Sequence, residues 1–555
     1  MTYAITQTCC SDATCVAVCP VNCIHPTPEE RAFGSTEMLH IDPKTCIDCG
    51  ACADACPVDA IFPVDSLTGP QREYAAVNAA YYDETDEGGP AENGPNFHAW
   101  GEPSFPRSLP SDFPALRVAV VGTGPAGMYA AQDLLLHTGA EVTLLDRLPV
   151  AGGLIRYGVA PDHPSTKKAG ETFARFYDHP RVRLRLGVEI GENGITAREL
   201  TAHHDAVIYA VGASSGRRLD IPGEDLAGSV SATTFVAWYN AHPDVAPDAV
   251  DLSAERVVVV GNGNVAVDAA RILLADPEEL ARTDIADHAL RALRGGNVRE
   301  VVLVARRGPE DAAYTASELR ALRHLPGVEL LVDDHDPRTG EAIDAAGPKE
   351  KAALLRGVAR AAVDWDRPPE PGRRRLVLRF HSAPLEATAG TDGAAVDAVR
   401  VTDAAGERTL RAGMLLRAVG YRGVPVDGLP FDETTGTVPH EGGRVTGLPG
   451  TYVVGWIKRG PSGGIGANRT CAAETVGTLL ADAVAGELPT PSGSPKDFAR
   501  LLRRRTRQVI DAKGLAAIER AELARGHRED RPRTKLATVQ ELTAAASPGL
   551  LRRVR

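Results

Sequence analysis

The chain has 555 residues, of which 43% are hydrophobic and 24% are charged, and its formal net charge is -12. This length predicts several domains of roughly 100 to 200 residues each. The negative charge argues against nucleic acid as the main partner. No apolar run approaches the roughly 18 residues that span a bilayer, and the first residues lack a secretory signal. We therefore expect a cytoplasmic protein without a membrane span.

Cysteine usage is strongly asymmetric. Nine of the ten cysteines lie between Cys9 and Cys56, and only Cys471 lies elsewhere. In a reducing compartment such a cluster favours metal binding over disulfides. The first 70 residues also carry nine acidic residues against two basic ones. Small electron carriers often dock through an acidic face, although solubility explains this charge equally well.

Two cysteine runs predict iron-sulfur clusters. The second run has the spacing C-x2-C-x2-C-x3-C-P of bacterial ferredoxins, and the first, less complete run ends before Pro20. In this arrangement the last cysteine of each run ligates the cluster of the other run. We assign one [4Fe-4S] cluster to Cys19, Cys46, Cys49 and Cys52, and a second cluster to Cys9, Cys15 and Cys56.

The type of the second cluster depends on its fourth ligand. Three well-spaced thiolates favour [3Fe-4S], whereas Cys10 offers a fourth thiolate and would allow [4Fe-4S]; Cys23 has the position of an unligated core cysteine. A zinc site would need four thiolates in one tetrahedron and would leave several cysteines unexplained. Residues 1–82 resemble a bacterial seven-iron ferredoxin. The run from Cys9 to Cys15 is shorter than in that family, so both Cys9 and Cys10 stay candidates for one ligand position.

The remainder of the chain predicts a linker followed by two nucleotide-binding units. Residues 83–115 are rich in Gly, Pro, Asp, Glu and Asn and predict an extended linker. An apolar strand at 117–121, a glycine turn, a helix at 126–136 and a strand at 141–145 follow. The same order recurs at 256–260, 266–274 and 301–305. Two such units predict an α/β fold with two dinucleotide sites.

The first glycine turn contains the spacing G-x-G-x-x-G. Gly122, Gly124 and Gly127 stand directly between a strand and a helix, where glycines permit a tight turn and close approach of a pyrophosphate to the helix N-terminus. Asp146 ends the following strand, where a carboxylate would accept the ribose hydroxyls. The alternative for the triplet alone is an ordinary tight turn.

The second glycine turn indicates a preference for NADP. It reads Gly261-Asn262-Gly263-Asn264-Val265-Ala266, with alanine in place of the third glycine. The next strand ends in Arg306 and Arg307 rather than in a carboxylate. Two guanidiniums would pair with a 2′-phosphate, which an aspartate would repel. The alternative is an arginine pair that is merely solvated.

Longer motifs carry a family resemblance over about residues 116–540. They are Gly152-Gly153-Leu154, Gly158-Val159-Ala160-Pro161-Asp162-His163-Pro164, Arg306-Arg307-Gly308-Pro309 and Gly455-Trp456-Ile457-Lys458-Arg459-Gly460-Pro461. Together they resemble the adrenodoxin-reductase type of ferredoxin-NADP reductase, and the fused ferredoxin resembles the actinobacterial two-part enzymes. The resemblance implies a multi-domain α/β fold, with an α+β ferredoxin followed by Rossmann-like FAD and NADP domains. The implied domains are ferredoxin 1–82, linker 83–115, FAD-binding 116–217 and 418–485, NADP-binding 218–417 and a C-terminal tail 486–555.

The resemblance also implies site residues. Those that would line FAD, besides the glycine triplet, are Ala126, Asp146, Leu154, Ile190, Trp456, Gly463, Gly464 and Ile465. Those that would bind NADP are Arg217, Asn262, Gly263, Asn264, Val265, Arg306, Arg307 and Glu318. Gly463, Gly464 and Gly466 precede a helical pattern, so their N–H groups would face the electron-rich edge of a reduced flavin.

Two residues are candidates for a catalytic role. His163 matches the family histidine near the flavin, and its alternative role is to fix the turn between Pro161 and Pro164. Glu318 is the other candidate. Ala321 stands where the family has a second carboxylate, and its methyl group cannot form the hydrogen bonds of a carboxylate. Hydride transfer itself needs no protein acid or base, so catalysis should be mostly positioning.

The expected function is that of a ferredoxin-NADP reductase with its own ferredoxin domain. Electrons would pass from NADPH to FAD as a hydride, then singly to the [4Fe-4S] and the second cluster, and then to an acceptor such as a ferredoxin or a cytochrome. The tethered acidic ferredoxin would meet basic residues such as Lys458 and Arg459. A disulfide reductase would need a cysteine pair beside the flavin, where only Cys471 is available. An electron-transfer subunit of a larger complex, akin to the small subunit of glutamate synthase, is the remaining alternative.

Overall fold

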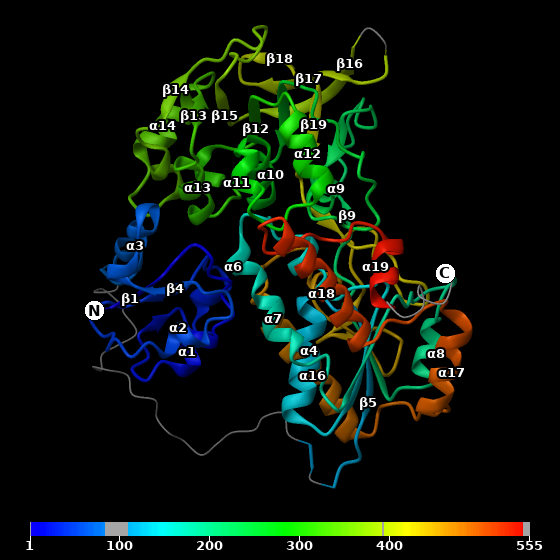
Figure 1. Cartoon of the computed structure of the whole chain (residues 1–555). Helices are drawn as coiled ribbons and strands as arrows, with labels where there is room; N and C mark the ends of the chain where they lie inside the picture. The colour runs from blue at the N-terminus through cyan, green and yellow to red at the C-terminus, as the bar shows by residue number, and fades with distance from the viewer. Residues whose placement is uncertain (1, 84–108, 111, 391–392, 548–555) are drawn as a thin grey trace.

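The computed structural model of the chain describes residues 2–83, 109–110, 112–390 and 393–547. Three parts are visible in Figure 1: a small N-terminal unit in blue, and two larger parts that are each built on a sheet. Most of the predicted linker 83–115 lies outside the described residues, and so do the last residues of the predicted C-terminal tail.

The N-terminal unit combines two antiparallel strand pairs with short helices. Its elements are β1 (Tyr3–Ile5), α1 (Thr14–Val18), β2 (Ile24–His25), β3 (His40–Ile41), α2 (Ala51–Ala55), β4 (Ile61–Pro63) and α3 (Glu73–Asp83). Strand β1 pairs with β4, and β2 pairs with β3. Helix α3 is fastened to both pairs by buried Asn78, whose Oδ1 accepts hydrogen bonds from the backbone N–H groups of Ile5 at 3.1 Å and Ile41 at 2.8 Å.

The first seven-stranded sheet is assembled from two distant stretches of the chain. In spatial order its strands are β21 (His440–Glu441), β22 (Arg444–Val445), β23 (Thr451–Val453), β8 (Ala206–Tyr209), β5 (Arg117–Val121), β6 (Glu141–Asp146) and β7 (Val182–Leu186). Helices α4 (Pro125–His137) and α16 (Ala467–Ala485) pack against each other beside it. Because β23 pairs in parallel with β8, the C-terminal half of the chain completes a sheet that the N-terminal half begins.

Short helices and a small strand pair surround this sheet. The helices are α5 (Leu154–Tyr157), α6 (Pro164–Lys167), α7 (Ala169–Ala174), α8 (Ala197–Thr201) and α15 (Trp456–Arg459). The pair consists of β9 (Ser215–Gly216) and β20 (Tyr421–Arg422), which run antiparallel where the chain leaves for the second sheet and where it returns.

The second seven-stranded sheet is entirely parallel. In spatial order its strands are β10 (Ser229–Ser231), β19 (Met414–Arg417), β11 (Arg256–Val260), β12 (Glu300–Val304), β15 (Arg374–Arg379), β13 (Val328–Asp333) and β14 (Ala359–Ala361). Its helices are α9 (Ala232–Tyr239), α10 (Asn264–Leu274), α11 (Pro277–Leu280), α12 (Asp287–Gly295), α13 (Ala316–Arg323) and α14 (Pro337–Ala345). The valine-rich strand β11 is buried along its whole length, as expected of a parallel strand with both faces covered.

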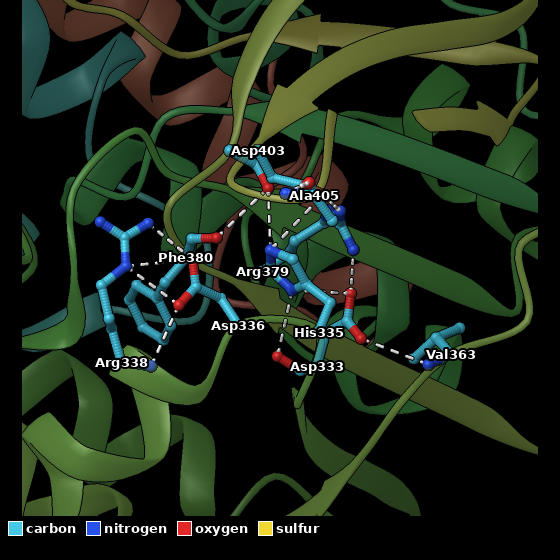
Figure 2. Close-up of polar contacts among 10 residues, drawn as sticks. Asp333, His335, Asp336, Arg338, Val363, Arg379, Phe380, Asp403 and Ala405 are labelled. Carbon is cyan, nitrogen blue, oxygen red and sulfur yellow. Dashed lines mark hydrogen bonds and ion pairs between the residues drawn. The ribbon is translucent and has the colours of Figure 1, made fainter. Parts of the chain in front are cut away.

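A buried charge cluster joins this sheet to a smaller antiparallel one. The smaller sheet consists of β16 (Ala383–Ala389), β17 (Val396–Asp403) and β18 (Gly406–Arg411). Figure 2 shows Arg379, at the end of β15, between the carboxylates of Asp333 and Asp403, and Arg379 binds both. His335 lies 3.4 Å from Asp333 and 3.8 Å from Asp403. Three strand ends from two sheets are thus held by side chains that are almost fully buried.

The C-terminal region is helical and more than a surface tail. Its helices are α17 (Pro495–Arg505), α18 (Ala512–Arg528) and α19 (Val539–Ala546). Glu522 of α18 is fully buried and binds Arg156 of α5 at 2.5 Å. Lys535 is also buried and lies 2.9 Å from Asp284, which precedes α12. The C-terminal region therefore binds to both larger parts of the molecule. Among the described residues, no helix is long and apolar enough to cross a membrane.

Candidate functional site

The first glycine turn has the geometry that its sequence predicts. Gly122 has φ +108°, and a Cβ there would lie 2.4 Å from the carbonyl oxygen of Ala210. A Cβ at Gly127 would lie 2.0 Å from the oxygen of Gly122, so both positions exclude a side chain. Around Gly124 the nearest neighbour of a Cβ would be the Cα of Gly153 at 3.8 Å. Space therefore remains beside the N-terminus of α4, where a phosphate group would be bound.

Asp146 fastens this turn from the end of β6. Its Oδ2 accepts hydrogen bonds from the backbone N–H of Thr123 at 2.9 Å and from the Thr123 hydroxyl at 2.6 Å, and its Oδ1 accepts one from the backbone N–H of Leu148 at 3.0 Å. The carboxylate thus positions the glycine turn. The predicted contact with ribose hydroxyls stays a prediction.

The segment after β23 closes over the same turn. A Cβ at Gly455 would lie 2.5 Å from the Cβ of Ala126, so this segment packs directly on the start of α4. The indole N–H of Trp456 donates to the carbonyl of Ser462 at 3.0 Å, and its ring lies 5.2 Å from that of Tyr421. The structure therefore brings together parts of the predicted flavin site that are more than 300 residues apart.

The other predicted flavin residues lie in three further segments of the chain. Leu154 follows Gly153, whose Cβ position would be 2.7 Å from the Cα of Gly124. Asn468 donates to the carbonyls of Gly464 at 3.0 Å and Ile465 at 3.1 Å, and Gly463 has φ +74°. Ile190 follows β7 and forms a bridge with Ile195.

The second glycine turn repeats this geometry and is supported by asparagines. Gly261 has φ +120°, and a Cβ there would lie 2.3 Å from the oxygen of Ala418. Asn264, the first residue of α10, accepts a hydrogen bond from the backbone of Thr315 at 2.8 Å. Asn262 accepts one from Ala313 at 3.4 Å, and Gly263 faces the same residue. Val265 follows on α10. The turn thus also positions the loop that leads into α13.

The predicted arginines lie at the edge of this site. Arg306 and Arg307 follow the end of β12 after Ala305, and both are exposed, as a 2′-phosphate contact requires. Arg307 lies 3.8 Å from Asp311. Arg217 is exposed directly after β9, and its Nε donates to the carbonyl of Tyr421 in β20 at 3.2 Å.

The two catalytic candidates converge from different parts of the chain. One ligand-type atom each of His163, Asp268 and Glu318 lies within 4.8 Å of the other two. Arg271 binds the surrounding carboxylates, at 2.5 Å from Asp162, 2.6 Å from Asp268 and 2.9 Å from Glu318. Because Asp162 belongs to the part with the first sheet and Arg271 to α10 beside the second, this cluster links the two larger parts of the molecule.

Burial and neighbouring charges shift the pKa values of two carboxyl groups in this cluster. Burial, followed by the charge of Asp268, raises the pKa of Glu318 above its usual value, against the opposing effect of Arg271. Burial alone would raise the pKa of Asp162, but the charge and the hydrogen bond of Arg271, with further contributions from His163 and the backbone, lower it. The sequence interpretation missed Asp268 and Arg271. Their i,i+3 spacing on a predicted helix, beside the second glycine turn, was the available signal.

Two cavities in the N-terminal unit match the two predicted cluster sites. One is lined by Cys19, Cys23, Cys46, Cys49 and Cys52, and the other by Cys9, Cys10, Cys15, Cys56 and Asp12. Each therefore has at least three thiols facing one space, as an iron-sulfur cluster requires. Burial raises the pKa of the Cys15 thiol, whereas iron binds the thiolate form and would oppose this shift.

The cavity lined by Cys9, Cys15 and Cys56 lies next to a loop that contacts the start of α16. The backbone N–H of Gly466 donates to the carbonyl of Cys10 at 3.1 Å, and a Cβ at Gly466 would lie 2.2 Å from that oxygen. Arg469 of α16 donates to the hydroxyl of Thr14 at 2.9 Å. The expectation that the N–H of Gly466 faces a flavin is therefore wrong, because the loop of the N-terminal unit accepts its hydrogen bond.

The expectation that Lys458 and Arg459 dock the acidic N-terminal unit is also wrong. Lys458 is buried in its own part of the molecule and binds Glu474 at 2.8 Å, and Arg459 donates to the carbonyl of Ser462 and to Asn468. Helix α15 directs both side chains inward. Among the described residues, the N-terminal unit is bound by other side chains, in the ion pairs Lys168–Asp59, Lys351–Glu37 and Arg469–Asp12 and in the contact between His324 and Glu73.

Comparisons with known proteins agree with this geometry. Residues 39–62 match the 4Fe-4S binding domain, and residues 116–308 match the pyridine nucleotide-disulphide oxidoreductase family. The probable ferredoxin/ferredoxin–NADP reductases of Mycobacterium bovis and Mycobacterium tuberculosis are 46% identical over 99% of this chain and 95% of their own length.

The chain belongs to the ferredoxin/ferredoxin–NADP reductase family.

Relatives without the fused N-terminal unit match the remainder. NADPH-ferredoxin reductase FprA of Mycobacterium tuberculosis is 45% identical over 77% of this chain and 98% of its own. The structure of that FprA in complex with NADPH has a TM-score of 0.71 and 41% identity, and it covers 78% of this chain and 100% of its own. The expected fold class and the function of a ferredoxin-NADP reductase with its own ferredoxin are confirmed. FAD, NADP and an iron-sulfur cluster are likewise supported, and the second cluster stays a prediction.

Proposed function

We propose that this ferredoxin-NADP reductase oxidises NADPH and delivers single electrons through its own ferredoxin unit to a separate acceptor protein, such as a ferredoxin or a cytochrome. The contact between Gly466 and Cys10 carries this proposal. It seats one cluster cavity against the segment that closes the first glycine turn. The ferredoxin unit thus has the position of an internal acceptor.

The site residues have distinct proposed tasks. The N-terminus of α4 holds the FAD pyrophosphate, and Trp456 with Gly463 closes the flavin site. Arg306 and Arg307 bind the 2′-phosphate of NADPH, because guanidinium forks pair with phosphate oxygens. FAD supplies the conversion of one hydride into two single electrons. Residues 116–217 and 418–485 form the proposed FAD-binding domain, 218–417 the NADP-binding domain.

His163 and Glu318 have a positioning task in this proposal. Both belong to the cluster through which Arg271 links the two larger parts of the molecule. The cluster fixes the distance between the two glycine turns, and with it the approach of the nicotinamide to the flavin. The protein contributes orientation, since hydride transfer requires no protein acid or base.

The docked geometry also suggests the order of the two clusters. Cys9, Cys15 and Cys56 line the cavity nearer to Gly466, whereas Cys49 of the other cavity is exposed. We therefore expect electrons to enter at the second cluster and to leave at the [4Fe-4S] site, the reverse of the order that sequence alone suggested. Exposed Ile47 beside Cys49 would contact the acceptor. The proposed location is the cytoplasm, where cysteine ligands stay reduced.

Gly466→Ala tests this proposal. Gly466 has a right-handed helical conformation, which alanine adopts readily, but the added Cβ would meet the backbone of Cys10, Ser11 and Asp12. The substitution therefore opposes docking with little local strain in its own helix. Gly477→Ala is the matched control, because a Cβ there has no neighbour within 4 Å.

NADPH-driven reduction of a small dye and of cytochrome c are then compared in the full chain. Gly466→Ala should lower cytochrome reduction several-fold relative to dye reduction, and Gly477→Ala should leave the ratio of the two rates unchanged. An unchanged ratio in Gly466→Ala would show that electrons bypass the docked ferredoxin unit.

A further inference from the structure

The two cysteine runs of the ferredoxin unit are copies of each other with an offset of 37 residues. The offset superimposes Cys9 on Cys46, Cys15 on Cys52 and Cys19 on Cys56. With this offset the second run, C-x2-C-x2-C-x3-C-P, corresponds to C-x2-D-x2-C-x3-C-P in the first run. Asp12 is the residue that takes the place of Cys49.

The backbone follows the same offset. Helices α1 and α2 both begin after a left-handed residue, Ala13 with φ 59° and Gly50 with φ 75°. They end at Cys19 with φ -74° and ψ 115° and at Cys56 with φ -73° and ψ 117°. The residues directly before Asp12 and Cys49 are also both left-handed: Ser11 has φ 53° and Asp48 has φ 60°. The two loops are therefore equivalent in conformation as well as in spacing.

Asp12 faces the cavity that this equivalence predicts. It lines the same space as Cys9, Cys15 and Cys56, just as Cys49 lines the space of its own set. Its side chain is only 9% exposed. Cys10, the other candidate, corresponds to Ile47, a position that supplies no ligand in the second run. The register of the two runs therefore favours the Asp12 carboxylate over the Cys10 thiol as the fourth ligand.

The surroundings of Asp12 suit a carboxylate that binds a cation. Oδ1 accepts a hydrogen bond from the backbone N–H of Thr14 at 3.2 Å, Oδ2 accepts one from the Thr14 hydroxyl, and Arg469 lies 3.9 Å away. These groups fix the Asp12 side chain where it lines the cavity. A carboxylate has about four lone-pair directions, so two remain for iron.

We propose that Asp12 is the fourth iron ligand of the second cluster, together with Cys9, Cys15 and Cys56. This inference rests on the proposed function only in assuming that a cluster occupies this cavity. Oxygen is a harder donor than the thiolates that iron-sulfur clusters prefer, so the iron at Asp12 is held less firmly than the other three. On oxidation by ferricyanide, a [4Fe-4S]²⁺ cluster gives up one electron, releases this iron as Fe²⁺ and becomes [3Fe-4S]⁺.

The test measures iron content and the EPR signal of the oxidised three-iron cluster in the full chain. Wild type is reconstituted anaerobically with Fe²⁺ and sulfide and then treated with ferricyanide. It should lose one iron per chain and gain the three-iron signal, and added Fe²⁺ with dithionite should reverse both changes. Asp12→Cys should keep that iron through the same oxidation. Asp12→Asn should hold one iron fewer even after reconstitution, because the amide is a poor iron ligand.

Two further variants separate the alternatives. Cys10→Ser should behave like wild type; if it, rather than Asp12→Asn, loses the fourth iron, the thiol is the ligand and the proposal is overturned. Arg469→Ala removes the docking contact of Asp12 but should leave the iron content unchanged. Identical iron release in wild type and Asp12→Cys would also contradict the proposal. None of these readouts uses NADPH turnover, so failure of the proposed electron path gives a different result from failure of this ligand assignment.

Discussion

Glu37 of the ferredoxin unit accepts a hydrogen bond from the backbone N–H of Ala316 at 2.7 Å, so one domain caps the N-terminus of a helix in another. The same carboxylate lies 3.0 Å from Lys351. At the other end of α13, Glu73 lies 3.0 Å from His324. The ferredoxin unit therefore contacts both ends of the helix that carries Glu318 (Figure 1).

This contact predicts that Glu37→Ala weakens docking. The variant loses both the cap on α13 and the ion pair with Lys351. Loss of the cap alone should weaken the free energy of docking by about 0.5–2 kcal/mol. Cytochrome reduction should fall relative to dye reduction, and Glu37→Gln, which keeps the acceptor for Ala316, should fall less. Glu29 is an exposed carboxylate of the same unit, and Glu29→Ala serves as the control. Equal ratios in all three variants would exclude a docking role for Glu37.

The exposed arginines after β12 predict the choice of nucleotide. Losing one charge-assisted contact costs about 1.5–3 kcal/mol, so Arg306→Ala should raise the Michaelis constant for NADPH about tenfold or more. The constant for NADH should change little. Steady-state kinetics with both nucleotides checks this, and equal losses for NADPH and NADH would show that Arg306 does not bind the 2′-phosphate.

The raised pKa of Glu318 predicts a pH-dependent loss of stability. The folded protein holds this proton to a higher pH than the unfolded chain does. The contribution of the group to stability is therefore complete below the unfolded pKa and is lost as pH rises towards the folded pKa. Glu318→Gln removes this titration. The difference in unfolding free energy between wild type and Glu318→Gln should thus shift in favour of the variant as pH rises from about 4.5, by at most about 1.4 kcal/mol per pH unit. A pH-independent difference in urea unfolding would contradict it.

The cluster in Figure 2 predicts a stability effect far from the cofactor sites. Arg379→Met would leave Asp333 and Asp403 buried without their cation. Breaking such a pair typically costs about 3–5 kcal/mol. Urea unfolding followed by circular dichroism should show a clear decrease in midpoint, whereas Arg373→Met, at a residue 58% exposed, should change it little. Similar midpoints for both variants would disprove a structural role for the cluster.

The features that sequence predicted are local in the chain. The glycine turns at Gly122 and Gly261 require positive φ and close backbone contacts, and these demands appear directly as glycine in the sequence. The strand at 117–121 has the predicted bounds, and the helix after it extends the predicted 126–136 by one residue at each end. Cysteine spacing likewise reflects the geometry of one loop. Such patterns are readable because each is completed within a few residues.

The features that sequence missed are contacts between distant residues. Arg271 and Asp162 are 109 positions apart, and Arg469 and Asp12 are further apart still. An arginine on a predicted helix gives no sign of which carboxylate it meets. Lys458 illustrates the reverse case: its charge suggested a docking surface, but the fold turns it inward. For Asp12, the proposed iron ligand, the signal in the sequence is the register of the two runs, because the residue itself is not a cysteine.

The central claim is that electrons pass from the flavin to the ferredoxin unit within one molecule. Stopped-flow mixing with excess NADPH, recorded at the absorbance of the clusters, tests it most directly when the protein concentration is varied about tenfold. The docked arrangement predicts a first-order rate of cluster reduction that does not depend on protein concentration, and a slower rate in Gly466→Ala but not in Gly477→Ala. A rate that rises in proportion to protein concentration would show that the ferredoxin unit is reduced by other molecules and would contradict the claim.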